Sequence, residues 1–320
     1  PNAAGHKLIG YPANNILSAS RTVNAVQGGL ILSGPLRGTA FNDNGTPRAF
    51  QYGLVFPNNP TFMQGGDGAG RNGFIGAPLM MIPTERYVGF GSLQYEFTDT
   101  LQGFAELSYG HTASHGRGAQ TRDFFPGGGN AITIRGDNPF LSADLRTSLQ
   151  NAGLPLTSAT SFVLGRMGDD FGYTDNRNQS DVMRVLVGLS GSLGAGWNWD
   201  VSVQYGRTQY DQEVGNNRVQ QQVLGVTNVT GQPTRIQLAA DATIDTNGQP
   251  ICRSTLTNPG NGCVPVNLFG VNNWSAAARD YLYADGWLKQ EFTQKALAAN
   301  LQGDLFSTWA GPVPLAVGVE

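Results

Sequence analysis

The feature that most constrains this chain is a period-two alternation of apolar and polar residues that recurs over long segments. In 87–97 the odd positions carry Tyr, Gly, Leu or Phe, while the even positions include Gln94 and Glu96. After a turn at 98–101 the alternation resumes in 102–112. Successive side chains of a strand point to opposite faces, so the pattern predicts a hairpin with one apolar and one polar face.

Two more hairpins follow the same logic. One joins 182–193 to 199–211, and the other joins 296–308 to 313–320. In both, the apolar residues fall mainly at odd positions, which we expect to form one outer wall. The residues that define this wall most clearly are Met183, Val185, Val187, Leu189, Val201, Val203 and Tyr205.

Composition narrows the class of protein. Only 13% of the residues are charged, whereas a soluble domain has about 25%. The 44 Gly and 17 Pro residues suit many turns, and a net charge of -3 without a basic stripe argues against nucleic acid as a partner. No apolar run reaches the roughly 18 residues of a membrane-spanning helix, but a spanning strand needs only about 9–11 residues.

Three features favour a membrane barrel over a soluble sandwich, which could also alternate. The expected strands are longer than the roughly 5–6 residues of globular proteins, their polar faces carry charges such as Glu106 and Asp304, and aromatic residues gather at the turns. The turns are short, whereas 113–181 and 212–295 are long polar excursions. We therefore predict an all-β fold: a partial transmembrane antiparallel β-barrel, formed as a curved meander sheet with long extracellular loops.

The expected organisation has two parts. Residues 1–86 form a loop-rich N-terminal part with one strand near Val26–Leu32, and 87–320 hold the barrel hairpins. The strand-like segment 162–173 is placed outside the membrane, because an extra crossing would put the loop 212–295 in the periplasm. Pro1 is not an initiator Met and Glu320 falls within an expected strand, so we expect a fragment whose six strands do not close into a barrel.

The chain has two cysteines, Cys252 and Cys263. They do not form a C-x-x-C motif, which argues against a metal or thioredoxin-type site. We prefer a disulfide that closes an extracellular loop, with two reduced thiols as the alternative.

Other motifs indicate no chemistry. The glycine-rich run 65–70 lacks the Lys of a phosphate-binding loop, and His111 and His115 lie four apart on a strand rather than a helix. Asp241 and Asp245 precede an Asn-Gly pair but do not fit an EF-hand, although an irregular calcium loop stays open. We predict no catalytic residues, no metal and no cofactor, and therefore no enzyme; the ligand-binding residues stay unknown.

Several stretches resemble TonB-dependent receptors, the active transporters of the Gram-negative outer membrane. The resemblance covers most of residues 87–320 and extends only loosely to residues 1–86. The stretches are GSLQYEFTDTLQGFAELSYGHT in the first hairpin, DNPFLSADLR at 137–146, MRVLVGLSGSLGAGWNWDVSVQYGRT at 183–208, ADATIDTNGQPICRSTLTNPGNGCVPVNLFG at 240–270 and GDLFSTWAGPVPLAVGVE at 303–320.

The resemblance implies a 22-stranded barrel plugged by an N-terminal domain. We expect the plug domain and the segment that contacts TonB to lie outside this fragment. It implies outer-membrane uptake of a scarce solute (an iron chelate, cobalamin or an oligosaccharide), with TonB and the membrane lipid as partners. Two alternatives stay open: a passive porin, and a secreted β-rich adhesin or carbohydrate-binding protein.

Overall fold

The computed structural model describes residues 19–56, 59–68, 79, 81–124, 132–219 and 233–320. The chain divides into two compact units. The sheet unit comprises Met80–Gly116, Asn176–Val214 and Gly286–Glu320. The core unit comprises Pro1–Leu79, Arg117–Asp175 and Gly215–Asp285. Each unit is therefore assembled from three separate stretches of the sequence.

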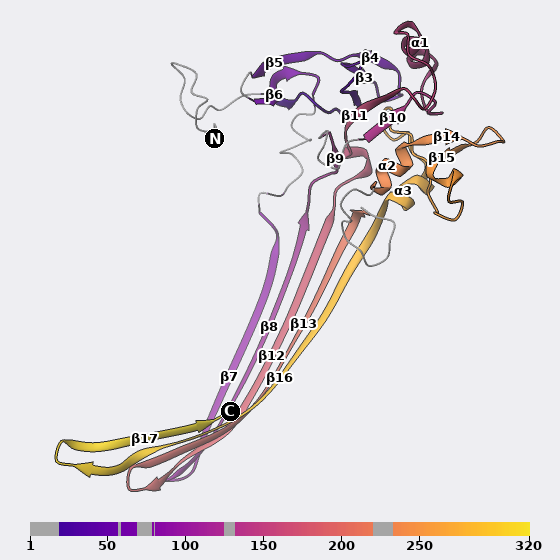
Figure 1. The fold of residues 1–320 in the computed structure, drawn as a ribbon. Helices are drawn as coiled ribbons and strands as arrows, with labels where there is room; N and C mark the ends of the chain where they lie inside the picture. The colour runs from indigo at the N-terminus through magenta and orange to yellow at the C-terminus, as the bar shows by residue number, and fades with distance from the viewer. Residues whose placement is uncertain (1–18, 57–58, 69–78, 80, 125–131, 220–232) are drawn as a thin grey trace, which may run out of the picture. The chain divides into compact units, whose positions relative to one another are not determined.

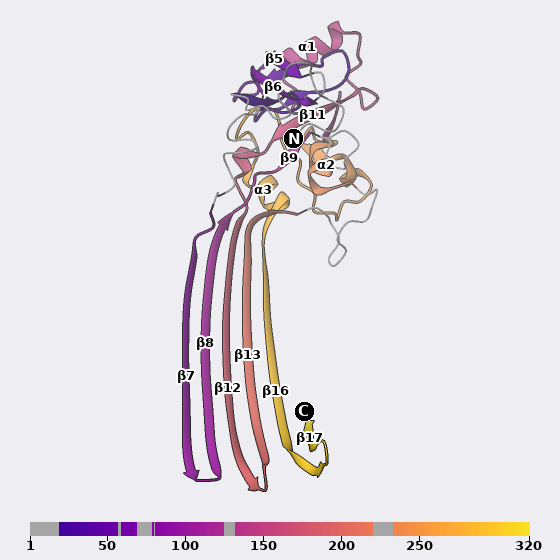
Figure 2. The same ribbon diagram turned by 90° about the vertical axis from the view of Figure 1, so that its left-hand side faces the viewer.

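The sheet unit is one antiparallel meander of long strands, which run side by side in Figures 1 and 2. Its order is β17-β16-β13-β12-β8-β7, so within the described residues β7 and β17 are its two edges and the sheet does not close. The strands are β7 (Thr84–Thr98), β8 (Leu101–Arg117), β12 (Asp175–Gly194), β13 (Trp197–Arg218), β16 (Tyr283–Thr308) and β17 (Gly311–Val319).

All three expected hairpins are present, joined by turns at 99–100, 195–196 and 309–310. The strands are longer than predicted, however, and β16 reaches 26 residues where we expected a start near 296. The reason is physical: 175–181 is polar on both faces, 212–218 has Val214 as its one large apolar residue, and 283–295 places its apolar residues without alternation. Hydrophobic alternation does not mark such segments as strands.

The register keeps the two faces separate. In the first hairpin, Leu93 stands opposite Ala105 and Gly91 opposite Leu107, so odd positions of both strands share a face. A β-bulge in β16 changes the alternation near the last turn. Because of this bulge, Phe306 stands opposite Val313, a pairing that unbroken odd-numbered alternation did not predict.

The core unit contains most of the short elements. Residues 20–66 form six short strands, where we predicted mostly loop with a single strand near Val26–Leu32. Its strands are β1 (Ser20–Thr22), β2 (Leu30–Ile31), β3 (Thr39–Phe41), β4 (Pro47–Ala49), β5 (Tyr52–Phe56), β6 (Asn59–Gly66), β9 (Arg122–Asp123), β10 (Ile132–Arg135), β11 (Ser161–Met167), β14 (Ala242–Ile244) and β15 (Pro250–Cys252). Its helices are α1 (Ala143–Asn151), η1 (Asp169–Phe171), α2 (Arg235–Ala240), η2 (Arg253–Leu256) and α3 (Ala276–Leu282).

Strand β11 is the centre of the core unit. It pairs with β10, β2 and β9, in a sheet separate from the long meander. The strand within 162–173 is therefore not part of the long meander. Among the described residues, no helix is long and apolar enough to cross a bilayer.

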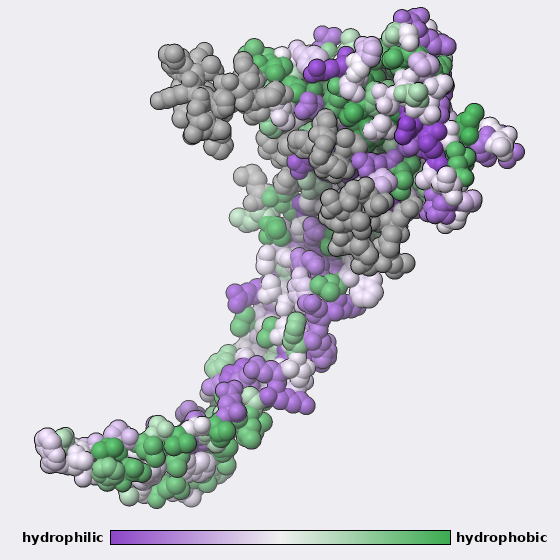
Figure 3. Space-filling model, viewed as in Figure 1, coloured by the Kyte–Doolittle hydropathy of each residue, from purple (hydrophilic) through white to green (hydrophobic). Residues whose placement is uncertain are grey.

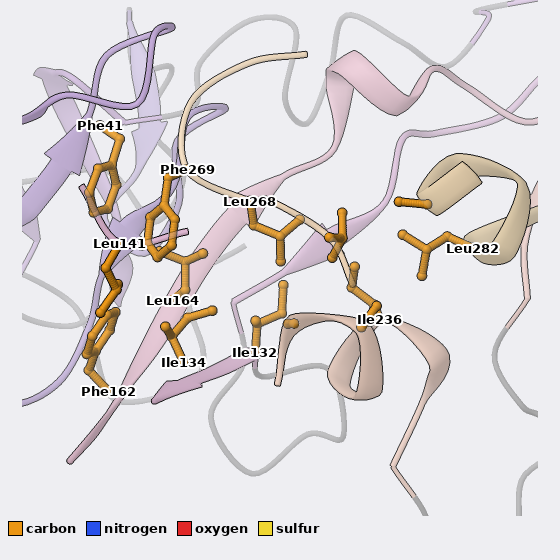
Figure 4. Packing of buried hydrophobic residues seen from close by; sticks show 14 of the residues in the cluster. Phe41, Ile132, Ile134, Leu141, Phe162, Leu164, Ile236, Leu268, Phe269 and Leu282 are labelled. Carbon is orange, nitrogen blue, oxygen red and sulfur yellow. The ribbon is translucent and has the colours of Figure 1, made fainter. Parts of the chain in front are cut away.

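A hydrophobic core lies where we expected polar loops. Buried side chains from β10, β11, α2, α3 and the segment 264–269 pack together (Figure 4). The rings of Phe41 and Phe269, for example, meet with their centroids 4.8 Å apart. The residues labelled in the figure are Phe41, Ile132, Ile134, Leu141, Phe162, Leu164, Ile236, Leu268, Phe269 and Leu282.

Candidate functional site

The even-numbered face of the sheet unit is hollowed near the tight turns. A cavity of about 830 Å³ lies there, against β7, β8, β12, β13, β16 and β17. Because a curved sheet encloses space on its concave side, this face is the concave one and the odd-numbered face is convex. The polar side chains that line the cavity at even positions are Glu96, Thr98, Thr100, Gln102, Ser190, Ser192, Asn198, Asp200, Asn300 and Gln302.

Polar side chains on the concave face bond across neighbouring strands. Arg184 donates from Nη1 to Glu106 at 3.0 Å and from Nε to Gln204 at 2.8 Å, which links three strands. Asn300 donates to Asp200 at 2.9 Å on the next pair of strands. Both partners of the Arg184–Glu106 pair stay more than a third exposed, so the pair contributes little to stability. These bonds connect neighbouring strands on the polar face, and the Arg184–Glu106 pair among them is accessible to water.

The convex face carries an apolar band. On β12 it runs from Met183 to Leu193, which matches the roughly 9–11 residues that a tilted strand needs to cross hydrocarbon. Side chains of this band are exposed to solvent: Val187 is 47% exposed and Leu193 is 69% exposed. Figure 3 shows apolar side chains gathered toward the end of the sheet that carries the tight turns. No element of the sheet unit's described residues covers this face.

Aromatic residues border the band at both limits. Near the turns lie Phe97, Trp197, Trp199, Phe306 and Trp309. Tyr87, Tyr109 and Tyr205 lie at the other limit, where charged residues begin on the same face.

The change to charged residues is marked by bonds between strands. Tyr109 donates to Asp181 at 2.7 Å, His111 Nδ1 lies 2.8 Å from the same carboxylate, and Arg207 donates to Glu291 at 2.8 Å. The convex face thus changes from apolar to charged at one level across four strands.

The two cysteines are bonded. Cys252 and Cys263 form a disulfide with their Cα atoms 6.1 Å apart, and no free cysteine is left in the chain. The closed loop is further held by Arg253, which donates to Asp137 at 2.7 Å and to Asp241 at 3.1 Å. Cross-linking of this loop therefore stabilises a folded part of the core unit.

The aspartates considered for calcium have other partners. Asp241 accepts hydrogen bonds from Arg135 and Arg253, so its charge is already neutralised. Asp245 accepts from the backbone N–H groups of Asn247 and Gln249 and thereby forms its own turn. Among the described residues, no group of three potential ligands could hold a metal ion.

The residues of the other sequence motifs lie in strands or form ion pairs and hydrogen bonds within the fold. His111 lies within β8 beside Asp181, and His115 follows on the same strand. Of the glycine-rich run, Asp67 pairs with Arg48 and accepts from the Gln51 N–H, while 69–70 fall outside the described residues. Glu106, one of the charges expected on the polar face, pairs with Arg184.

A buried ion pair organises the core unit. Arg166 and Asp170 are 2% and 0% exposed, and their side chains form two hydrogen bonds of 2.9 and 2.7 Å. Burial raises the pKa of Asp170, but the bonds from Arg166, helped by Asn272 and Trp274, outweigh it and hold the pKa below its ordinary value. This pair has a scaffolding role, since Arg166 also donates to the carbonyl groups of Leu268 and Gly270.

Sequence reasoning missed one set of exposed residues. Val88, Phe90 and Phe292 stand at even positions, and are 65%, 67% and 62% exposed. The signal was present in the sequence, because apolar residues at even positions break the alternation that defines the polar face.

The chain was compared with protein-family models, curated proteins and solved structures, and none of them matches it.

Proposed function

We propose that this chain is part of the wall of a β-barrel in the outer membrane of a Gram-negative bacterium, and that the barrel takes up a scarce solute. The observation that supports it is the two-faced sheet, with an apolar convex band of membrane height and a polar concave face. In this role the convex band contacts lipid and the concave face borders the solute's path.

The physical argument concerns what can cover the convex face. Monomeric soluble proteins rarely expose apolar patches larger than a few hundred Å². Hydrocarbon accepts such a face without cost and requires only that backbone groups be paired within the sheet. The aromatic rows at both limits of the band suit the two interfaces of a bilayer.

The energy-coupled step rests on the resemblance to TonB-dependent receptors. In this reading TonB is the partner and the solute is an iron chelate, cobalamin or an oligosaccharide. A passive porin would have the same two-faced wall but would not need TonB. A secreted adhesin or carbohydrate-binding protein would leave the membrane fraction without detergent.

The membrane step is tested by charge placed on either face of one strand. Val203→Arg puts a cation on the convex band, where a midplane Arg costs about 2–4 kcal/mol. Ser202→Arg, one residue earlier, puts the same cation on the concave face. We expect the Val203 variant to lose most of its heat-modifiable, protease-resistant form in outer membranes, and the Ser202 variant to retain it. Equal yields of the two variants would refute a lipid-facing convex side.

The uptake step needs a separate measurement. Cells that carry the native protein should accumulate the solute only when TonB and the proton gradient are present. Unchanged uptake in cells without TonB would favour the porin.

A further inference from the structure

An uncharged band crosses the concave face beyond the Glu106–Arg184 pair. It consists of the even-numbered positions in 88–90, 108–110, 178–182, 206–210 and 290–292, and none of them carries a charged side chain. Five strands, from β7 to β16, contribute to it.

Contacts between neighbouring strands place these positions at one level. Phe90 stands opposite Ser108 in the first hairpin. The bond from Tyr109 to Asp181 then aligns 108 with the region of Val182. On the other side, Tyr210 bonds to Asn178 and Arg207 bonds to Glu291, which brings the positions around 208 beside Phe292. The band therefore extends across the strands, over about four interstrand spacings or roughly 19 Å.

The ends of the band are aromatic and open. Phe90 on β7 and Phe292 on β16 are both more than 60% exposed, and Val182 between them is 44% exposed. On a wet face these rings expose apolar surface that a ligand could remove from water, worth roughly 25 cal/mol per Å². Their faces are free to stack on a flat, weakly apolar partner.

Between the rings stand neutral hydrogen-bonding groups. Tyr210 donates to the Asn178 side-chain oxygen at 3.1 Å, which leaves the amide NH2 of Asn178 and the Tyr210 oxygen lone pairs to meet a ligand. Ser108 and Gln290 add a hydroxyl and an amide at the same level. Charged side chains border the band on both sides of this face: the Glu106–Arg184 pair, which neutralises itself, and Arg86, which stands at the next even position of β7 beyond Val88.

We propose that this uncharged band is a binding subsite for an extended, neutral carbohydrate. A sugar ring has an apolar face of C–H groups that stacks on Phe, and a rim of hydroxyl groups that bonds to neutral amides and hydroxyls. A charged chelate, in contrast, needs opposite charge within its site once water is displaced, and no side chain of the band itself is charged. The spacing of the two Phe rings suits a chain of several sugar rings.

This inference rests on the proposed function, because the concave face must border the solute's path. It also narrows that function, since it selects neutral oligosaccharides over charged chelates.

The test uses the native protein, purified in detergent micelles, and calorimetric titration. The probes are linear gluco-, xylo- and galacto-oligosaccharides of three to six rings, with oligogalacturonates of the same lengths as anionic comparators. We expect at least one neutral series to bind more tightly than the anionic series. Phe90→Ala and Phe292→Ala should each weaken that binding by about three- to tenfold, while Phe90→Tyr retains it.

The matched control is Tyr95→Ala, which removes a ring of similar exposure from the convex face of the same strand. It should leave sugar affinity unchanged. The proposal is overturned if no neutral series binds, if both Phe→Ala variants bind as the parent does, or if Tyr95→Ala weakens binding equally. Membrane assembly of the Val203 and Ser202 variants and TonB-dependent uptake do not depend on sugar binding, so failure here is distinguishable from failure of the proposed function.

Discussion

Replacement of Arg166 by Met tests how the core unit is held together. The guanidinium group bonds to both carboxylate oxygens of Asp170 and to two carbonyl groups of the segment 268–270. Met has a similar length but no donors, so Asp170 becomes a buried charge without its cation. Removal of one partner of a buried ion pair costs about 3–5 kcal/mol.

The assay is native-state amide hydrogen exchange in β11. A loss of about 3–5 kcal/mol lowers the protection of amides such as Leu164 by roughly 100- to 4,000-fold, provided that these amides exchange by opening of the core unit. Arg135→Met is the matched control, because Arg135 is 38% exposed and its partner Asp241 keeps a bond from Arg253. The control should cost less than about 1 kcal/mol. Equal losses of protection in the two variants would refute the view that burial of the ion pair sets its importance.

Three further predictions concern the disulfide, acid stability and a close contact. Thiol titration of the unfolded, unreduced chain should find no free thiol, and Cys252→Ala with Cys263→Ala should destabilise their loop by about 2–3 kcal/mol in chemical denaturation; two reactive thiols would contradict the pairing. The pKa of Asp170 is lower in the folded protein than in the unfolded chain, so the ionised carboxylate stabilises the fold above about pH 4, the unfolded pKa. This stabilisation is lost as pH falls through the folded pKa, so the rate of proteolysis of the core unit should rise below about pH 4. A proteolysis rate that does not change with pH would contradict the assignment. A Cβ on Gly303 would lie 2.5 Å from the Trp197 ring, so Gly303→Val should displace the ring and shift its fluorescence, whereas an unchanged spectrum would show that the ring does not cover this glycine.

The sheet was predictable where one face is apolar. Val185, Val187, Val201 and Val203 alternate with polar residues, and this local pattern was enough to locate the hairpin and its turn. The outer lengths of β12 and β13 were not predictable in this way, because nearly all of their side chains are polar.

The core unit escaped prediction for a different reason. Phe41 packs on Phe269, yet neither residue lies in a periodic apolar segment. Short strands of two or three residues, such as β2 and β9, are too brief for any period to appear. Long-range pairing defines these elements, and a single sequence carries no direct record of it.

The candidate site was half predictable. The polar face followed from alternation, but Phe90 and Phe292 looked like exceptions to it. Only the strand register shows that Phe90 and Phe292 lie at one level of the same face and belong to one band.

The assembly of the core unit from three separate stretches has a consequence for folding order. Asn273 donates to the carbonyl group of Asp43 across 230 residues of sequence, and the Val271 N–H donates to the same oxygen. Contacts of such high contact order form slowly, because a long loop must close before they stabilise anything. The segment 20–66 is made first yet cannot complete its packing until 264–282 has emerged, after two hairpins of the long sheet. The core unit therefore cannot complete its packing before β7, β8, β12 and β13, which lie between its three stretches, have been synthesised.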